Sequence, residues 1–215
     1  MLRPSRIILI LALGLLVYIV FFSVPPGQPG QTFNPEKLGK LEMEVLQAEH
    51  ERHSVRLFFS ITAKLREEIG YTWFRAADAG FHRTRAMLSS RSARVHYDLV
   101  LPDLTRAYEI ERDWRGSSFD AEAAAKAELN SWLARRRPEI STAETLSNLI
   151  AESDALRYNA SHELMRGAAM ERVRALELRD AGGSTPDWNG VRAALVESYK
   201  IIRQAVRSSR KLSAR

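Results

Sequence analysis

The chain has 215 residues, a formal net charge of +6 and no cysteine. The lack of cysteine excludes disulfides, a cysteine nucleophile and a lipid-modified N-terminal cysteine. About 180 residues follow the N-terminal segments, which is the length of one domain, and arginines interleave with glutamates along much of it.

An uncharged apolar run, Ile7 to Val24, lies near the start of the chain. At 1.5 Å per residue a helix of this run spans about 27 Å, close to the hydrocarbon thickness of a bilayer. The run is longer than the apolar core of a signal peptide, and it ends in bulky residues before Pro25 and Pro26. We therefore expect residues 1–24 to hold a cytoplasmic stub and an uncleaved transmembrane anchor. A cleaved signal peptide and a buried soluble helix are the alternatives.

The charges that flank this run predict its orientation. Arg3 and Arg6 precede it, and the next basic residue after it is Lys37. The positive-inside rule then places the N-terminus in the cytoplasm and the domain outside it, in the periplasm or beyond. A third alternative keeps the domain in the cytoplasm, where its basic C-terminus would touch lipid headgroups or nucleic acid. With the predicted topology, nucleic acid is disfavoured as a partner.

Residues 25–33 are rich in proline and glycine and are expected to form an extended spacer. From residue 34 onward, apolar residues recur at helical spacing, and strand-like alternation is absent over any useful length. Helix boundaries are expected at five places: starts at Asn34-Pro35, Asp120 and Thr185-Pro186, and ends at Gly70 and Gly182-Gly183.

Two further signals concern helix continuity. Ser141-Thr142-Ala143-Glu144 matches a capping box, which predicts a helix starting there. Pro102 is expected to kink or break its helix near Leu101. Together these patterns predict an all-α fold: a single transmembrane helix, then a bundle of about six to eight helices over residues 34–215.

Familiar catalytic motifs are missing from the sequence. No phosphate-binding loop, dinucleotide fingerprint or nucleophile elbow occurs. His50 and His53 lie three residues apart beside Glu49, a spacing that suits a divalent ion on one helix face but more often belongs to a solvated charged surface. The sequence favours a non-enzymatic role, so no catalytic, cofactor-binding or metal residue is assigned and no cofactor is expected.

One polar group stands out on the helix expected after Asp120. Glu128, Trp132 and Arg135 are four and three residues apart, so they share one helix face. A carboxylate and a guanidinium beside an indole suit a small anionic or zwitterionic ligand or a partner surface, which Asp103 and Tyr108 would face from the neighbouring helix. The alternative is core packing by Trp132 with a surface ion pair beside it.

Three segments together carry a resemblance: Leu101-Pro102-Asp103-Leu104 with Ala107-Tyr108, the segment from Ala125 to Arg136 that contains Glu128, Trp132 and Arg135, and Pro186-Asp187-Trp188 with Glu197-Ser198-Tyr199. In this combination the chain resembles uncharacterised bacterial proteins with one N-terminal membrane helix and an all-helical domain. The resemblance covers most of the chain after Lys40. It implies the architecture and transfers no activity and no functional residue.

Two functions follow as expectations. The first is a membrane-anchored accessory or scaffold protein that contacts a protein partner at the cell envelope. The second is a membrane-bound enzyme or small-ligand-binding domain with a pocket around Glu128, Trp132 and Arg135.

Overall fold

The computed structural model describes residues 33–91, 97–137 and 141–213, together with four positions between residues 11 and 18. All regular structure in these ranges is helical, which confirms the all-α class. The predicted anchor, apart from those four positions, and most of the spacer lie outside the described residues. Within the described ranges, no helix has the length and apolar character needed to cross a membrane.

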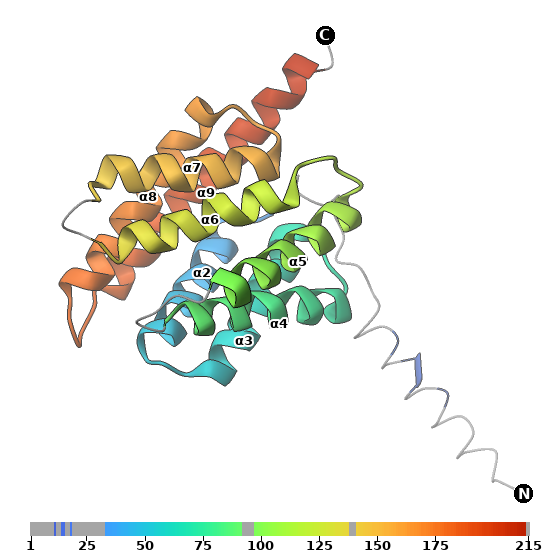
Figure 1. Cartoon of the computed structure of the whole chain (residues 1–215), viewed down its shortest axis with the longest axis horizontal. Helices are drawn as coiled ribbons and strands as arrows, with labels where there is room; N and C mark the ends of the chain where they lie inside the picture. The colour runs from blue at the N-terminus through green and yellow to red at the C-terminus, as the bar shows by residue number, and fades with distance from the viewer. Residues whose placement is uncertain are drawn as a thin grey trace, which may run out of the picture.

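Eight helices make up the described part of the chain, in agreement with the expected number (Figure 1). Their order is α2 (Pro35–His50), α3 (Ser54–Ile69), α4 (Trp73–Ser90), α5 (Tyr97–Arg115), α6 (Ala121–Arg135), α7 (Ala143–Tyr158), α8 (His162–Ala181) and α9 (Trp188–Ser213).

Side chains and glycines set several helix ends where the sequence predicts them. The Asn34 carboxamide oxygen accepts a hydrogen bond from the Glu36 amide at 3.0 Å, and Asp120 accepts one from Ala123 at 3.0 Å. Gly70 ends α3 in the left-handed conformation (φ 76°), which glycine adopts without a steric penalty. Gly182 follows the end of α8.

The helix expected at the capping box of residues 141–144 is confirmed: α7 begins at Ala143, and its N-cap Thr142 accepts from the Thr145 amide through its hydroxyl. Two other expectations differ from the structure. Pro102 does not break its helix, because α5 runs from Tyr97 to Arg115 with the proline in its second turn. The last helix begins at Trp188, two residues beyond Pro186, where the Asp187 carboxylate accepts from the Gly190 amide at 3.0 Å.

The eight helices form a closed ring. Each packs against its neighbours in the chain, and α9 packs against α2 to close the circle. Short connections make consecutive helices antiparallel, and Figure 1 shows α2–α5 in one half of the molecule and α6–α9 in the other. Close approach at the closing contact needs a residue without a side chain, because a Cβ on Gly39 of α2 would lie 2.5 Å from the Cγ2 of Val196 on α9.

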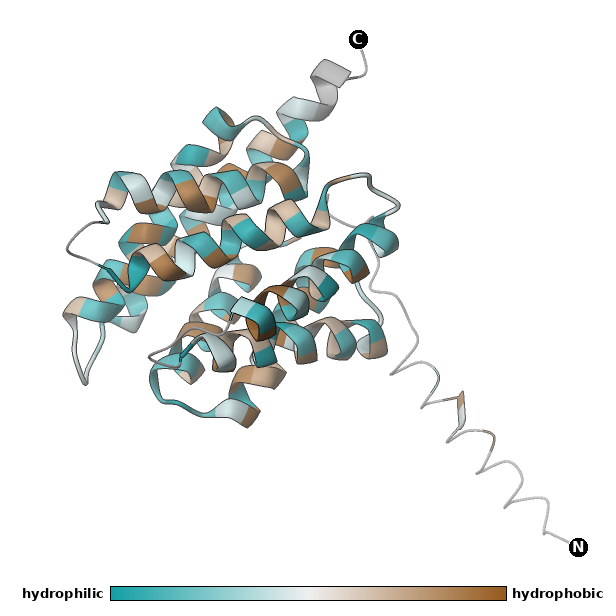
Figure 2. Cartoon of the chain, viewed as in Figure 1, coloured by the Kyte–Doolittle hydropathy of each residue, from teal (hydrophilic) through white to brown (hydrophobic). Residues whose placement is uncertain are grey.

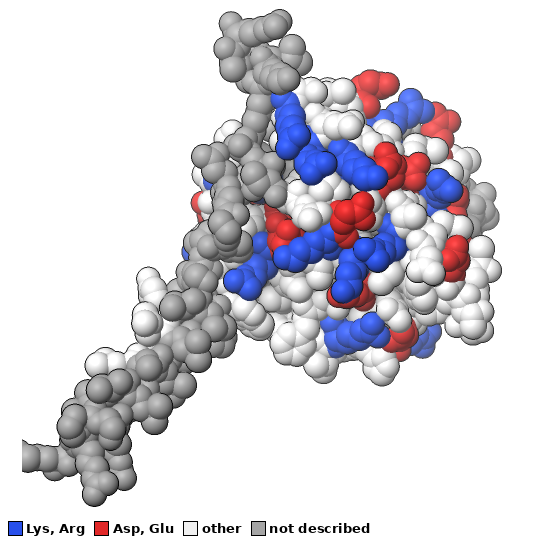
Figure 3. All heavy atoms as spheres, turned by 180° about the vertical axis from the view of Figure 1, so that it is seen from behind, with Lys and Arg blue, Asp and Glu red and all other residues white. Residues whose placement is uncertain are grey.

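The apolar core is divided among four clusters that lie between neighbouring helices. The first cluster has residues from α2, α7, α8 and α9, and the second has residues from α2, α3, α4 and α5. The third lies among α4, α5 and α6, and the smallest lies among α2, α8 and α9. Figure 2 shows the hydrophobic residues as stripes on each helix, alternating with hydrophilic ones. The face of the molecule in Figure 3 carries basic and acidic side chains interspersed. This arrangement leaves the centre of the ring to polar residues.

Candidate functional site

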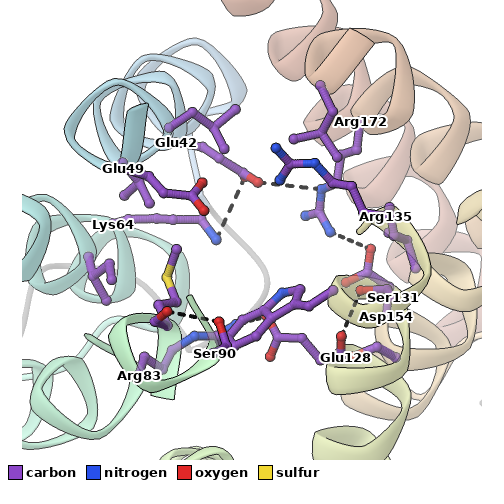
Figure 4. Close-up of a pocket in the computed structure, with 18 of the residues that line it drawn as sticks. Glu42, Glu49, Lys64, Arg83, Ser90, Glu128, Ser131, Arg135, Asp154 and Arg172 are labelled. Atoms are coloured by element: carbon purple, nitrogen blue, oxygen red, sulfur yellow. Dashed lines mark hydrogen bonds and ion pairs between the residues drawn. The ribbon is translucent and has the colours of Figure 1, made fainter. Parts of the chain in front are cut away.

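A cavity of about 340 Å³ lies at the centre of the ring. All eight helices contribute to its lining (Figure 4). The lining residues Arg136 and Asp180, at the ends of α6 and α8, are exposed, so the cavity reaches the surface where these helices finish.

Nine ionisable side chains from seven helices converge in and behind this cavity. None of them has more than 16 % of its side chain exposed, although charged groups are rarely buried unless they are paired. They are Glu42 of α2, Lys64 and Glu68 of α3, Arg83 of α4, Glu111 of α5, Glu128 of α6, Asp154 and Arg157 of α7, and Arg172 of α8.

Arg157 holds the deepest part of the network. Its guanidinium donates to both oxygens of Glu111, at 3.0 Å and 3.2 Å, and lies 3.3 Å from a carboxylate oxygen of Glu68. Arg115 adds a second ion pair to Glu111 at 3.0 Å, and the Tyr158 hydroxyl donates to Glu68. The buried charges on this side are therefore paired and mostly hydrogen-bonded.

Arg172 and Glu42 come from different helices and approach each other at the cavity (Figure 4). Arg172 donates to Asp154 at 2.7 Å, and its Nε atom is 3.8 Å from Glu42. Glu42 also lies 3.7 Å from the Lys64 ammonium and accepts a hydrogen bond from the Tyr199 hydroxyl. These contacts bring α2, α3, α7, α8 and α9 to one point.

A third group joins α4, α5 and α6. Glu128 accepts from the Arg83 guanidinium and from the Tyr108 hydroxyl. The Arg83 and Arg157 guanidinium groups lie over the Tyr108 ring at 5.2 Å and 5.4 Å from its centroid, within the range of cation–π attraction.

The electrostatic environment keeps two carboxylates ionised and the tyrosines protonated. Burial alone would raise the pKa of Glu68, but Lys64 and Arg157 hold it well below its usual range. Glu42 has a lowered pKa for the same kind of reason, since Lys64 and Arg172 outweigh its burial. Burial raises the pKa of Tyr108, Tyr158 and Tyr199, so their hydroxyls act as hydrogen-bond donors at neutral pH.

Four of the five residues singled out in the sequence lie together. Tyr108, Glu128, Trp132 and Arg135 all line the cavity. Glu128 does not pair with Arg135, whose guanidinium is 28 % exposed and lies 3.4 Å from Asp180 of α8.

Asp103 lies apart from this site and does not line the cavity. Its carboxylate accepts from His82 at 2.8 Å and from the Arg85 guanidinium, which ties α5 to α4. His50 ends α2 and His53 caps α3, and both are exposed. No group of side chains in the described ranges is arranged to hold a metal ion.

Sequence reasoning missed most of the charged residues of the cavity. One signal was present, because Glu42, Glu68 and Arg172 each interrupt an apolar stripe that the rest of their helix keeps. One charged residue in the apolar stripe of a single helix predicts little. Charged residues at such positions in several helices of the same bundle predict a polar interior.

The cavity offers charged hydrogen-bonding groups on all sides. The neighbouring cations lower the pKa of Glu42 and Glu68, whereas burial raises the pKa of Asp154. The arrangement suits recognition of a polar molecule. No protein-family model matches the chain, and no characterised protein or solved structure shows significant similarity to it.

Proposed function

We propose that residues 34–215 form a small-ligand-binding domain whose ligand lies in the cavity at the centre of the ring, and that residues 7–24 anchor this domain to a membrane. The supporting observation is the convergence of nine ionisable side chains on a cavity of about 340 Å³. This volume falls within the range of roughly 300–1,000 Å³ typical of small-molecule sites.

The energetics of burial support a functional reason for these charges. Desolvating an ion pair costs several kcal/mol per ion, and apolar residues of equal volume often stabilise a protein as well or better. The ring has apolar clusters between its helices, so it does not need charges at its centre to fold. A ligand that uses these groups explains why the centre is ionic and hollow.

A scaffold role, the other function expected from the sequence, has its own supporting observation. Phe59 of α3 and Phe74 and Phe81 of α4 are each more than half exposed, and the Phe59 ring lies 6.5 Å from that of Trp73. These aromatic side chains are on the outside of the ring, so protein contact through them does not depend on the cavity.

A cavity-filling substitution tests the proposal. Ser131 of α6 lines the cavity and is buried, so Ser131→Phe places a bulky side chain in the space that the ligand would occupy. Ser208→Phe on the exposed surface of α9 is the matched control.

Thermal unfolding of the full chain in detergent micelles, with a panel of anionic, cationic, zwitterionic and neutral compounds at constant ionic strength, provides the measurement. We expect one class to raise the melting temperature of the wild type and of Ser208→Phe, because a ligand that binds the folded state stabilises it, and to leave Ser131→Phe unchanged. A panel without any stabilising compound, or equal stabilisation of Ser131→Phe, would overturn the proposal. A scaffold function would be unaffected by Ser131→Phe.

A further inference from the structure

The ion pairs around the cavity fall into a tight set and a loose set. Arg157 binds Glu111 with hydrogen bonds of 3.0–3.2 Å, and Arg172 binds Asp154 at 2.7 Å. In contrast, Glu42 lies 3.7 Å from Lys64 and 3.8 Å from Arg172, beyond hydrogen-bonding distance of both. The loose set therefore leaves Glu42 without a hydrogen bond from either of the two cations beside it.

Arg172 has a free donor edge beside the cavity. Its Nη1 atom is taken by Asp154, whereas Nε and Nη2 are buried and have no hydrogen-bond acceptor among the described residues. These two nitrogens form one side of the guanidinium fork, which matches a carboxylate or a phosphoryl group with two parallel hydrogen bonds. A buried donor without an acceptor is costly, so this edge is suited to an acceptor that arrives with a ligand.

Lys64 lies on the opposite side of Glu42 from Arg172 (Figure 4). Its ammonium is 3.3 Å from Glu68 and 3.7 Å from Glu42, and it makes no hydrogen bond within the described part of the chain. The side chain is 14 % exposed and lines the cavity. Two cations from α3 and α8 therefore flank one carboxylate, and both have donors available.

The open end of the cavity carries basic side chains. Arg135 and Arg136 lie toward the open end, where they would attract an anion to the cavity.

We infer that the ligand is a compact organic anion whose carboxylate or phosphoryl oxygens bind between Lys64 and the free Nε–Nη2 edge of Arg172. This inference rests on the proposed function and names the chemical class of its ligand. The Glu42 carboxylate lies between these two cations, 3.7 Å from Lys64 and 3.8 Å from Arg172, so the ligand has to displace it in order to bind both. Glu42 competes with the ligand for the same two cations, and the hydrogen bond from Tyr199 gives its carboxylate a partner that the ligand does not remove.

Isothermal titration of the full chain in detergent micelles tests this assignment with three probes: inorganic phosphate, succinate and the neutral analogue succinamide. We expect phosphate, succinate or both to bind, and succinamide not to bind. Binding of phosphate alone assigns a phosphoryl ligand, and binding of succinate alone assigns a carboxylate; either result supports the site.

Substitutions in the loose set give opposite expected effects. Arg172→Lys keeps the positive charge and removes the fork, and it should weaken binding of the anion about tenfold or more. Glu42→Gln removes the competing negative charge and should strengthen binding several-fold. A purely structural role for Glu42 predicts weaker binding instead, so this variant separates the two roles.

The exposed pair of Arg166 and Glu144 provides matched controls, because Arg166→Lys and Glu144→Gln make the same chemical changes outside the cavity. Both should leave the affinity unchanged. The assignment is overturned if anions bind equally well to Arg172→Lys and to the wild type. It is also overturned if, in the thermal-unfolding experiment, cationic or neutral compounds are the ones that stabilise the wild type but not Ser131→Phe. In either case the cavity is still a ligand site, whereas a panel without any ligand rejects the proposed function itself.

Discussion

Glu68 illustrates how single residues in the ring tolerate a buried charge. Its side chain is fully buried, and its carboxylate lies 3.3 Å from Lys64 and 3.3 Å from Arg157 and accepts from Tyr158. Arg157 and Tyr158 donate hydrogen bonds to one of its oxygens, and the Lys64 ammonium lies beside the other as an ion pair. A substitution that removes this carboxylate takes one ion-pair partner from Lys64 and one from Arg157.

We expect Glu68→Gln to lower the free energy of unfolding by about 3–5 kcal/mol at pH 7, because it breaks a buried ionic network at one partner. Chemical denaturation measures the change. Glu144→Gln, in the exposed pair with Arg166, is the control, for which the expected change is below about 1 kcal/mol.

The same substitution makes a prediction about pH. Because the pKa of Glu68 is lower in the folded than in the unfolded state, its stabilising contribution is complete above the unfolded pKa of about 4.3 and is lost as the pH falls through the folded pKa. The melting temperature of the wild type should therefore decrease on acidification below about pH 4–5. The decrease should be shallower for Glu68→Gln, and equal slopes would contradict this account.

The candidate site shows which residue-level predictions sequence can support. Glu128, Trp132 and Arg135 could be predicted from the sequence, because they share one face of one helix and helical geometry alone brings them together. Lys64 and Arg172 come from α3 and α8, and no local pattern connects them. Their approach depends on how the ring closes.

At the scale of helices, local sequence signals predict where a helix ends better than they predict which helices pack against it. The side chains of Asn34 and Asp120 accept hydrogen bonds from the first turns of their helices. Gly70 ends its helix in a left-handed conformation, which a residue without a side chain adopts readily. The pairing of α2 with α9 joins residues as far apart in sequence as Glu42 and Tyr199, which are separated by 157 positions. Such a contact follows from the packing of all the helices between them.

The closing contact depends on Gly39. A Cβ at this position would lie 2.8 Å from the backbone nitrogen of Val196, and backbone cannot move aside as a flexible side chain can. We expect Gly39→Ala to lower the free energy of unfolding by about 1–3 kcal/mol despite the higher helix propensity of alanine. Denaturant titration measures this difference.

Gly167 of α8 is the matched control for Gly39. A Cβ there would meet the Ile201 side chain at 3.8 Å, an ordinary van der Waals distance. Gly167→Ala should therefore raise the free energy of unfolding by up to about 1 kcal/mol. If Gly39→Ala were also stabilising, the tight packing of α2 against α9 would be ruled out as the constraint.

At the scale of the whole molecule, the ring begins where the predicted spacer ends. Phe33 is buried, and its ring packs edge-on against Tyr199 at 5.8 Å. The chain is thus fixed to the ring from residue 33, and the spacer before it, at about 3.1 Å per residue, would hold the domain some 20–30 Å from the membrane surface. A ligand could then enter the cavity from the compartment in which the ring lies.

The orientation of the predicted anchor decides which compartment that is. Arg3 and Arg6 precede residues 7–24, so the positive-inside rule predicts that the ring lies outside the cytoplasm. Alkaline phosphatase fused after Arg215 should therefore be active, because this enzyme matures only outside the cytoplasm. A fluorescent protein that matures only in the cytoplasm, fused at the same point, should stay dark.

The flanking charges provide the control for this topology. Replacing Arg3 and Arg6 by glutamate should decrease the phosphatase activity and increase the fluorescence, since it removes the charge bias that sets the orientation. Fluorescence of the unaltered fusion would reverse the predicted topology. The cavity would then take its anion from the cytoplasm, and the basic residues of α9, including Arg203 and Arg207, would lie in the compartment where the membrane surface carries anionic lipids.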